Sequence, residues 1–202
     1  MEINLKVLKG LRPVVFLDRD GTLNEEVGYI HDVSNLNLIE GAAEAVRRLN
    51  EAGVAAVLTT NQSGVARGYY PETHIHKLHE RLVSLLAKGG AKLDAVYYCP
   101  HLPDGSVKDF SFACECRKPE PGMVTQALHE HEGEYDPART YVVGDKSTDV
   151  ELAQKCGAKG VLVTTGFGQD VLDGKYQWPV QPDYTAKDLS DAVDWILKDL
   201  YS

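Results

Sequence analysis

Five short runs of apolar residues recur along the chain, each five or six residues long. Within each run the apolar positions are nearly continuous and do not alternate with polar ones. Continuous runs of this kind are typical of parallel strands that helices cover on both faces of a sheet. We therefore predict strands at PVVFL (13–17), VAAVLT (54–59), AVYYC (95–99), TYVVG (140–144) and GVLVT (160–164).

Between these runs the apolar positions change to a helical spacing. In segment 41–53, Ala45, Val46 and Leu49 fall on one helical face, and Gly53 provides a stop. Alternation of strands and helices predicts a doubly wound α/β parallel sheet, which we expect to form one domain over residues 1–202. The other predicted helices cover 71–90, 122–131, 147–157 and 188–200.

Charge and composition narrow the class of protein. The formal net charge is −9, which argues against a nucleic-acid binder with a basic face but leaves room for a small phosphorylated ligand. No apolar run approaches the roughly 20 residues of a membrane span, and the first residues, MEINLKVLKG, are too short and polar for a signal peptide. We therefore expect a cytoplasmic protein that does not bind membranes, with a monomer as the default.

Polar side chains follow several of the predicted strands. Asp18 and Asp20 come directly after the first strand, Thr60 after the second and Asp145 after the fourth, while Lys118 lies in a loop. The carboxyl ends of parallel strands meet at one edge of a sheet, where ligands bind. Besides these five residues, the same edge should receive Asn61, Gln62, Arg117, Lys146 and Asp149.

This set of groups suits phosphoryl transfer. Carboxylates around a small pocket favour Mg²⁺, and a lysine and a hydroxyl beside them suit a phosphoryl group. Asp18 would attack phosphorus, while Asp20 would protonate the leaving oxygen and then activate water. Thr60 and Lys118 would neutralise the phosphoryl oxygens, and Asp145 would complete the magnesium site.

Other interpretations fit less well. A single Asp-x-Asp after a strand is most often a turn or a helix cap, so only the conjunction of motifs at successive strand ends carries the interpretation. A module that only binds phosphosugars has no need of two acids facing a phosphate. A kinase would be expected to carry a G-x-x-x-x-G-K-[ST] loop, which the sequence lacks.

The motifs resemble those of the haloacid dehalogenase superfamily of phosphohydrolases. They are Asp18-x-Asp20-x-Thr22, Thr60, Lys118 and Gly144-Asp145 with Asp149 following. The stretches FLDRDGTLN, EVGYIH, TNQSGVARG, YYCPH, CECRKPEPGM and VVGDK resemble the branch that hydrolyses heptose 1,7-bisphosphate at the 7-phosphate, and histidinol-phosphate phosphatases share several of them. The resemblance implies a haloacid dehalogenase-like Rossmannoid core, a phosphosugar substrate and a place in surface polysaccharide (lipopolysaccharide) biosynthesis. Histidinol phosphate remains the alternative substrate.

The resemblance also implies roles for individual residues. Asp18 would be the nucleophile and a Mg²⁺ ligand, Asp20 the general acid and base with its main-chain carbonyl on the metal, and Asp145 a further ligand. Thr60 and Lys118 would hold the transferred phosphoryl group. The segments that would contact substrate comprise Glu26, Val27, Gly28, Tyr29, Asn61, Gln62, Ser63, Arg117 and Lys146.

Four residues form a C-x-H-x12-C-x-C pattern: Cys99, His101, Cys114 and Cys116. Three thiolates and one imidazole make a complete tetrahedral shell for a structural Zn²⁺. A Cys114–Cys116 disulfide would be strained, and a cytosolic compartment disfavours it. The loop has little apolar content, so we predict that zinc orders it and fixes the direction of Arg117 and Lys118. Cys156, on a helix, fits simple packing.

The gaps between motifs are too short for a cap domain, so we expect a capless enzyme. Its site should be bordered by loops 24–35, 64–70 and 100–117. Arg67 and Arg117 lie on two of these loops and are candidates to bind the second phosphate of a bisphosphate. On helix 71–90, we interpret His74, His76 and His79 as surface or groove residues.

Overall fold

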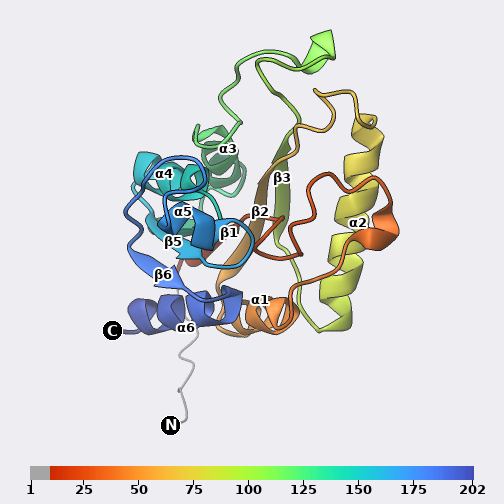
Figure 1. The fold of residues 1–202 in the computed structure, drawn as a ribbon. Coiled ribbons are helices and arrows are strands. Elements are labelled where there is room, and N and C mark those ends of the chain that lie inside the picture. Colours follow the sequence, from red (N-terminus) through yellow and green to blue (C-terminus); the bar gives the residue numbers. More distant parts are fainter. Residues whose placement is uncertain (1–9) are drawn as a thin grey trace.

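The computed structural model describes residues 10–202 and contains one sheet of six parallel strands in the order β3-β2-β1-β4-β5-β6 (Figure 1). All five predicted strands are confirmed, and the predicted doubly wound α/β class is confirmed with them. The strand that the sequence analysis missed, β6, has only three residues. The strands are β1 Arg12–Leu17, β2 Ala55–Asn61, β3 Ala95–Cys99, β4 Tyr135–Gly144, β5 Lys159–Val163 and β6 Tyr184–Ala186.

The helices follow the predicted segments, with one addition. That addition is the five-residue helix α5, too short to give a helical pattern. The opening segment MEINLKVLKG lies, up to residue 9, outside the described residues. The α-helices are α1 Ala42–Glu51, α2 Glu72–Lys88, α3 Gly122–Glu130, α4 Ser147–Cys156, α5 Gly168–Leu172 and α6 Leu189–Leu200, and the 3-10 turns are η1 Val33–Asn35 and η2 Lys108–Phe110.

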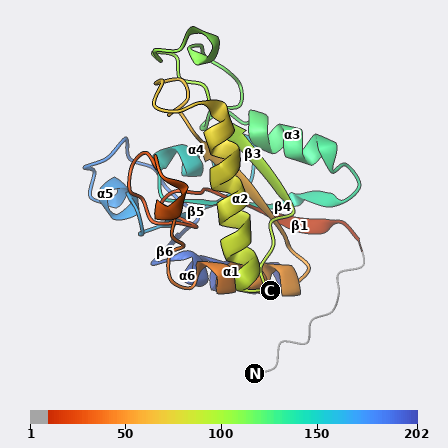
Figure 2. The same ribbon diagram turned by 90° about the vertical axis from the view of Figure 1, so that its right-hand side faces the viewer.

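Strand β1 shows why the apolar runs are continuous. Its alternate residues face opposite sides of the sheet: Val15 and Leu17 belong to the core under α1, α2 and α6. Val14 and Phe16 belong to a second core, shared with α3 and α4. Helices cover both faces of the sheet (Figure 1, Figure 2). Every position from Pro13 to Leu17 is therefore buried.

The strand order positions the site. From β1 the chain builds the sheet outward through β2 to β3, and then returns to the other side of β1 with β4. A crevice forms where the order reverses, beyond the carboxyl ends of the strands. Asp18 lies there, with its backbone N–H donating to the carbonyl of Val143 over 2.9 Å. The loop that carries η2 projects above this edge (Figure 1, Figure 2).

Within residues 10–202 no further sheet or cap domain is inserted at either expected place. The segment between β1 and α1 contains only η1 and isolated bridges, and the segment between β2 and β3 contains only α2. The capless prediction is therefore confirmed.

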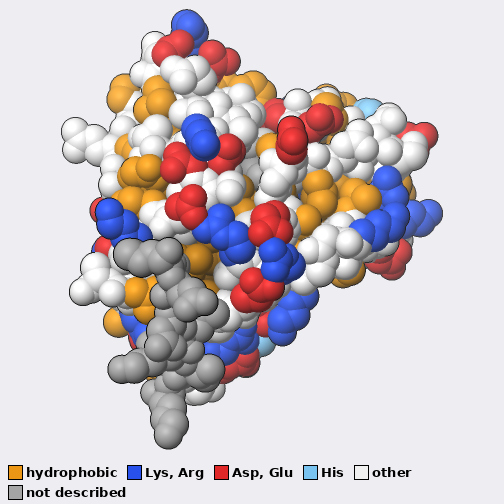
Figure 3. Space-filling model, turned by 90° about the horizontal axis from the view of Figure 1, so that it is seen from below, with side chains coloured by type: hydrophobic (Ala, Val, Ile, Leu, Met, Phe, Trp, Pro, Cys, Tyr) orange, Lys and Arg blue, Asp and Glu red, His pale blue; other side chains and the backbone are white. Residues whose placement is uncertain are grey.

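Two surface properties bear on possible partners. None of the helices in the described part of the chain combines the length and the apolar character that a membrane crossing requires. On the face shown in Figure 3, acidic and basic side chains lie interspersed among apolar ones.

His79 differs from the sequence interpretation, because it is buried and not on the surface or in a groove. It is 7% exposed on α2, and its ring lies 5.5 Å from that of Tyr98 between centroids. Burial, with help from the charge of Arg19, lowers the pKa of His79 from 6.5 to about 3. Folding therefore keeps this imidazole neutral at any moderately acidic pH.

This burial predicts a pH-dependent stability. Below about pH 6.5 the unfolded chain binds a proton at His79 that the folded chain does not, so stability falls as the pH falls. Between pH 7.5 and pH 5, His79→Gln should remove about 2 kcal/mol of the wild-type loss in unfolding free energy, measured by urea denaturation. His129→Gln, at an exposed position, should leave the wild-type dependence intact. Equal pH dependence in both variants would contradict this account.

Candidate active site

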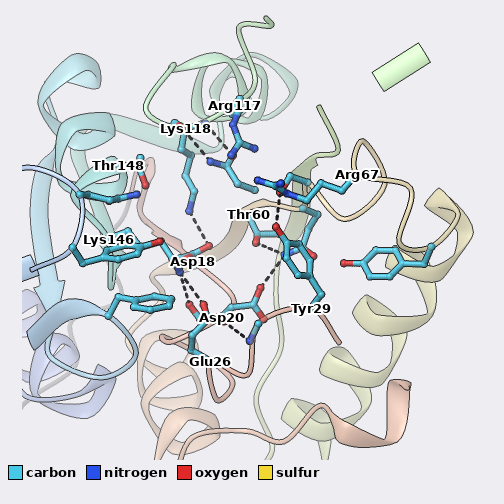
Figure 4. A pocket seen from close by; sticks show the side chains of 18 residues that line it. Asp18, Asp20, Glu26, Tyr29, Thr60, Arg67, Arg117, Lys118, Lys146 and Thr148 are labelled. Carbon is cyan, nitrogen blue, oxygen red and sulfur yellow. Dashed lines mark hydrogen bonds and ion pairs between the residues drawn. The ribbon is translucent and has the colours of Figure 1, made fainter. Parts of the chain in front are cut away.

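Asp18 and Lys118 form a buried ion pair at the end of β1. The Nζ atom of Lys118 lies 2.8 Å from Oδ1 of Asp18 and 2.5 Å from Oδ1 of Asp149, and it also donates to the carbonyl of Thr59 over 2.9 Å. The side chains of Asp18 and Lys118 are 6% and 2% exposed. In Figure 4, Lys118 extends down to Asp18 from the loop that also carries Arg117. The structure thus brings together two residues that are 100 positions apart in sequence.

The backbone of Lys118 is also held in place. The side-chain amide of Asn61 donates to the carbonyl of Lys118, and the N–H of Lys118 donates back to Oδ1 of Asn61, both over 3.0 Å. Asn61 is the last residue of β2, so these two hydrogen bonds hold the loop that carries Lys118 against the end of the sheet. These contacts occupy both polar atoms of the Asn61 amide.

Asp20 is turned toward groups other than Asp18. Its carboxylate accepts hydrogen bonds from Arg19, Asn24 and Gln62. Gln62 also donates to the hydroxyl of Thr60 over 3.0 Å. The two acids that flank Arg19 therefore have distinct surroundings, one lysine-paired and the other held by a guanidinium and two amides.

An acidic cluster includes Asp18. Carboxylate oxygens of Asp18, Asp145 and Asp149 all lie within 4.8 Å of one another, in an arrangement that could hold a metal ion. The oxygens of Asp149 are already engaged, one by Lys118 and the other by the backbone N–H of Lys146 over 3.1 Å. Asp145 is fully buried, and a Cβ atom on Gly21 would collide with its carboxylate.

The ammonium of Lys146 lies among the oxygens that the sequence analysis assigned to magnesium. It is 2.9 Å from Oδ1 of Asp145, 3.4 Å from the carbonyl oxygen of Asp20 and 3.8 Å from Oδ2 of Asp18. It also lies 3.2 Å from Oε2 of Glu26. Carboxylate and carbonyl oxygens therefore surround one positive charge, that of the Lys146 ammonium. Oxygen ligands of these kinds suit a hard divalent cation.

Charge and burial compete in setting the pKa values. Burial alone would raise the pKa of Asp18, but Lys118 and Lys146 lower it below its ordinary value. Asp145 is the opposite case, because burial raises its pKa to about 7 despite the neighbouring Lys146. Burial would lower the pKa of Lys118, but Asp149 and Asp18 raise it. Asp18 is therefore an anion paired with a firmly protonated lysine.

A cavity of about 340 Å³ opens above these groups. Of the predicted catalytic, substrate-contacting and magnesium-binding residues, two do not line it: Asp145 is fully buried, and Val27 is 55% exposed. Most of the predicted site residues do line it, namely Asp18, Asp20, Glu26, Gly28, Tyr29, Thr60, Asn61, Gln62, Ser63, Arg67, Arg117, Lys118 and Lys146.

Sequence reasoning missed part of the cavity wall. Phe167 follows β5, and its backbone N–H donates to Oδ2 of Asp145 over 2.9 Å, so the same strand-end argument could have found it. Tyr176 and Gln177 come from a loop without any periodic pattern, and no sequence signal marks them. Tyr70 and Thr148 complete the missed set.

Arg67 and Tyr29 lie across the cavity from Lys146 (Figure 4). The guanidinium carbon of Arg67 lies 5.9 Å from the centroid of the Tyr29 ring, and the Tyr29 hydroxyl lies 3.4 Å from that of Ser63. Ser63 and Arg67 come from the same loop after β2. The second cation, Arg117, donates to the carbonyl of His101 over 3.0 Å.

The cysteine–histidine residues converge as predicted. Sγ of Cys114 lies 3.5 Å from that of Cys99 and 3.3 Å from that of Cys116. Nδ1 of His101 lies 3.4 Å from Sγ of Cys116 and 3.7 Å from Sγ of Cys99. A tetrahedral zinc shell requires ligand-to-ligand separations of about 3.5 to 3.8 Å. All four cysteines of the chain are free, so no disulfide competes for these thiols.

This cluster is connected to both candidate phosphate-binding loops. Arg117 follows the last cysteine and bonds the His101 carbonyl, while Ser106 and Val107 donate their backbone N–H groups to the carbonyl of Ala66 over 2.7 and 2.9 Å. The ring of Phe112 lies 4.3 Å from that of His101 between centroids. Hydrogen bonds therefore link loop 100–117 to the side chain of Arg117 and to the loop that carries Arg67.

Comparison with known proteins bears on this site. A family model described as HAD-hydrolase-like matches residues 115–192. The D-glycero-D-manno-heptose-1,7-bisphosphate 7-phosphatase of Thermosynechococcus vestitus is 54% identical over 189 residues, covering 92% of this chain and 95% of that protein. The chain belongs to the heptose 1,7-bisphosphate 7-phosphatase family. Its members from Yersinia pestis and Escherichia coli K12 are 46% and 42% identical, each over 93% of this chain and 91% and 90% of their own lengths.

Solved structures of the family share the fold. A D,D-heptose 1,7-bisphosphate phosphatase from B. bronchiseptica, solved with magnesium and phosphate, matches with a TM-score of 0.80 and 30% identity, covering 93% of this chain and 99% of its own. The enzyme from Burkholderia thailandensis matches with a TM-score of 0.67 and 27% identity, covering 95% of this chain and 100% of its own. The resemblance to the haloacid dehalogenase superfamily is confirmed, and the chain is a phosphoric monoester hydrolase.

Proposed function

We propose that this protein removes the 7-phosphate of D-glycero-D-manno-heptose 1,7-bisphosphate, through an aspartyl-phosphate on Asp18 and with Mg²⁺ bound. The observation that carries the proposal is the buried carboxylate of Asp18, 2.8 Å from Lys118 at the base of a cavity that Thr60 also lines. The names of the family members support the substrate. The product would serve the synthesis of activated heptose for surface polysaccharide.

Asp18 is suited to attack phosphorus. Lysine neighbours keep its pKa below the ordinary value, so its carboxylate is ionised and nucleophilic at neutral pH. Lys118 would hold an equatorial phosphoryl oxygen while it pairs with Asp18, and the Thr60 hydroxyl would donate to another. Because Lys118 also contacts Asp149, its charge stays fixed while the Asp18 oxygen forms the new bond to phosphorus.

Asp20 would act first as the general acid and then as the general base. As Asp18 bonds phosphorus and the sugar oxygen leaves, Asp20 gives that oxygen a proton. Asp20 then accepts a proton from the water that attacks the aspartyl-phosphate, which frees phosphate and restores Asp18. Two acids in different surroundings, one held as a nucleophile and one beside hydrogen-bond donors, suit these two roles.

Asp18, Asp145 and the carbonyl of Asp20 would hold Mg²⁺. Their fit rests on their convergence around the Lys146 ammonium and on the close approach of Gly21, which leaves no room for a side chain beside Asp145. Bound Mg²⁺ would supply charge neutralisation for the phosphoryl oxygens. Lys146 would then contact the substrate, as the family resemblance implies.

Cys99, His101, Cys114 and Cys116 would hold a structural Zn²⁺. The fit rests on separations of 3.3 to 3.7 Å between neighbouring donor atoms, which lie within about 0.5 Å of the edges of a tetrahedral shell. A closed shell leaves no position for water, so the ion would act on the order of the loop and not on the reaction.

The proposal is tested by phosphate release from both anomers of D-glycero-D-manno-heptose 1,7-bisphosphate, with histidinol phosphate as the comparison. We expect kcat/KM for a heptose bisphosphate to exceed that for histidinol phosphate by at least about 100-fold, since an amine or imidazole cannot replace a phosphate beside two arginines. Phosphorus NMR should show that the 1-phosphate remains. Preferential hydrolysis of histidinol phosphate, or loss of the 1-phosphate, would contradict the proposal.

Arg67 is expected to bind the phosphate that is not transferred. Arg67→Ala should raise KM for the bisphosphate roughly 10- to 100-fold, since a hydrogen bond between charged groups contributes about 1.5–3 kcal/mol. KM for a heptose 7-monophosphate should change less than about threefold, and Arg117→Ala should show the same selectivity. As a control, Arg47→Ala on α1 removes an arginine that pairs with Glu44 outside the cavity. Equal effects on both substrates would exclude this role.

A further inference from the structure

Arg19 separates the two acids of the motif and is almost completely buried. Its side chain is 1% exposed, and its Nη2 atom lies 2.8 Å from Oδ2 and 3.0 Å from Oδ1 of Asp20. Its Nε atom donates to Oδ1 of Asp20 over 3.1 Å. A planar guanidinium that contacts both carboxylate oxygens fixes the plane of the carboxylate as well as its position.

Gln62 holds the same carboxylate from the other side. It is 4% exposed, and its Nε2 atom donates to Oδ2 of Asp20 and to the hydroxyl oxygen of Thr60, both over 3.0 Å. The two hydrogens of the amide are thereby used. Because Thr60 accepts from Gln62, its own hydroxyl hydrogen remains available for a phosphoryl oxygen. One amide therefore connects the proposed acid to the proposed phosphoryl site.

Asn24 completes the set. Its Nδ2 atom donates to Oδ1 of Asp20 over 2.9 Å and to the carbonyl of Glu25 over 2.9 Å. Asn24 is fully buried in the loop after β1. Asp20 thus receives donors from its own loop, through Arg19 and Asn24, and from the end of β2, through Gln62.

We propose that Arg19 and Gln62 are positioning residues that orient the Asp20 carboxylate for proton transfer to the leaving oxygen. This inference rests on the proposed function, in which Asp20 gives its proton to the sugar oxygen as the Asp18–phosphorus bond forms. Arg19 fixes the plane of the carboxylate, and Gln62 sets its distance from the phosphoryl group that Thr60 holds. If the ion pair between Arg19 and Asp20 only stabilised the loop, its loss would affect the reaction equally for every leaving group.

The leaving group distinguishes these possibilities. A sugar alkoxide needs a proton to depart, whereas 4-nitrophenolate is a stable anion that leaves without one. Misplacing the proposed acid should therefore slow formation of the aspartyl-phosphate from a sugar phosphate far more than from 4-nitrophenyl phosphate. Hydrolysis of the aspartyl-phosphate needs Asp20 for either substrate, so this step should be slow in the variants. They should therefore release 4-nitrophenol in a burst.

The experiment uses Arg19→Lys, which keeps one charge but loses the planar fork, and Gln62→Met, which removes the two donors at similar length. For Arg19→Lys we expect kcat/KM for the heptose bisphosphate to fall about 100-fold. The single-turnover release of 4-nitrophenol should fall less than about fivefold. Gln62→Met should change the ratio of the two rates in the same direction, by about tenfold, and it keeps the test valid if the Arg19 variant does not fold. Arg48→Lys, on α1 beside Asp194, should leave both rates unchanged.

Asp20→Asn, measured in parallel, separates this inference from the proposed function. If Asp20→Asn leaves the ratio of the two rates unchanged, the acid role of Asp20 fails and the proposed mechanism fails with it. If Asp20→Asn changes the ratio but Arg19→Lys and Gln62→Met lower both rates equally, or lower neither, only the positioning role is overturned.

Discussion

Asp18→Asn is expected to lower kcat for heptose bisphosphate hydrolysis by at least about 10⁴-fold, because a carboxamide is a far weaker nucleophile than a carboxylate. The substitution keeps the size of the side chain. Lys118 retains its contact with Asp149, so the buried lysine keeps a carboxylate partner and the fold should persist. Steady-state phosphate release, with circular dichroism to verify folding, measures the effect.

Two variants serve as comparisons for that result. Asp20→Asn should lower kcat by about 10²- to 10⁴-fold, since it removes proton transfer and leaves the nucleophile in place. Asp194→Asn, at an exposed position on α6, should have wild-type activity. A folded Asp18→Asn variant with a kcat within tenfold of the wild type would exclude Asp18 as the nucleophile.

Loss of the cysteine–histidine metal site should change the metal content, the order of a loop and the turnover together. Cys114→Ser should abolish the stoichiometric zinc that mass spectrometry would find in the wild type. Without the metal, amide hydrogen exchange across residues 100–117 should accelerate at least about tenfold, because few buried apolar side chains order this loop. Since Arg117 bonds the carbonyl of His101, kcat/KM should fall about 100-fold, as a displacement of roughly 1 Å can cost that much.

The fourth cysteine supplies the control for the metal site. Cys156 is half-buried on α4, outside the cluster, so Cys156→Ser should retain zinc, loop protection and activity. A zinc-free Cys114→Ser protein with wild-type exchange in the loop and wild-type turnover would show that the metal does not position the cations.

The sequence predicts the strands and the groups at their ends for a simple physical reason. Both faces of the sheet are covered, so each strand from β1 to β5 contains a continuous apolar run, and the polar residues that follow these runs mark one edge. The same logic brings Asp18, Thr60 and Asp145 to the crevice between β1 and β4. Likewise, a C-x-H-x12-C-x-C pattern strongly indicates a zinc site, because three thiolates and one imidazole complete the tetrahedral shell of that metal.

Other features depend on packing that local sequence does not encode. Strand β6 and helix α5 are too short to show a period, and Tyr176 and Gln177 reach the cavity from an irregular loop. His79 lies on an amphipathic helix, and its spacing did not reveal that it would be buried against Tyr98. Arg19 is similar, because an arginine between two aspartates suggests a solvated side chain unless its burial is known.

The central claim, that Asp18 bonds phosphorus, is tested most directly by trapping the intermediate. Enzyme quenched during turnover of the heptose bisphosphate is reduced with borohydride, which converts an acyl phosphate into an alcohol. Mass spectrometry of the peptide that contains FLDRDGTLN then identifies the reduced position. The account predicts homoserine at position 18, absent from Asp18→Asn and from enzyme without substrate. Reduction at another residue would contradict this claim. The absence of homoserine from Arg19→Lys enzyme that is quenched after a burst of 4-nitrophenol, when the intermediate has accumulated, would also contradict it.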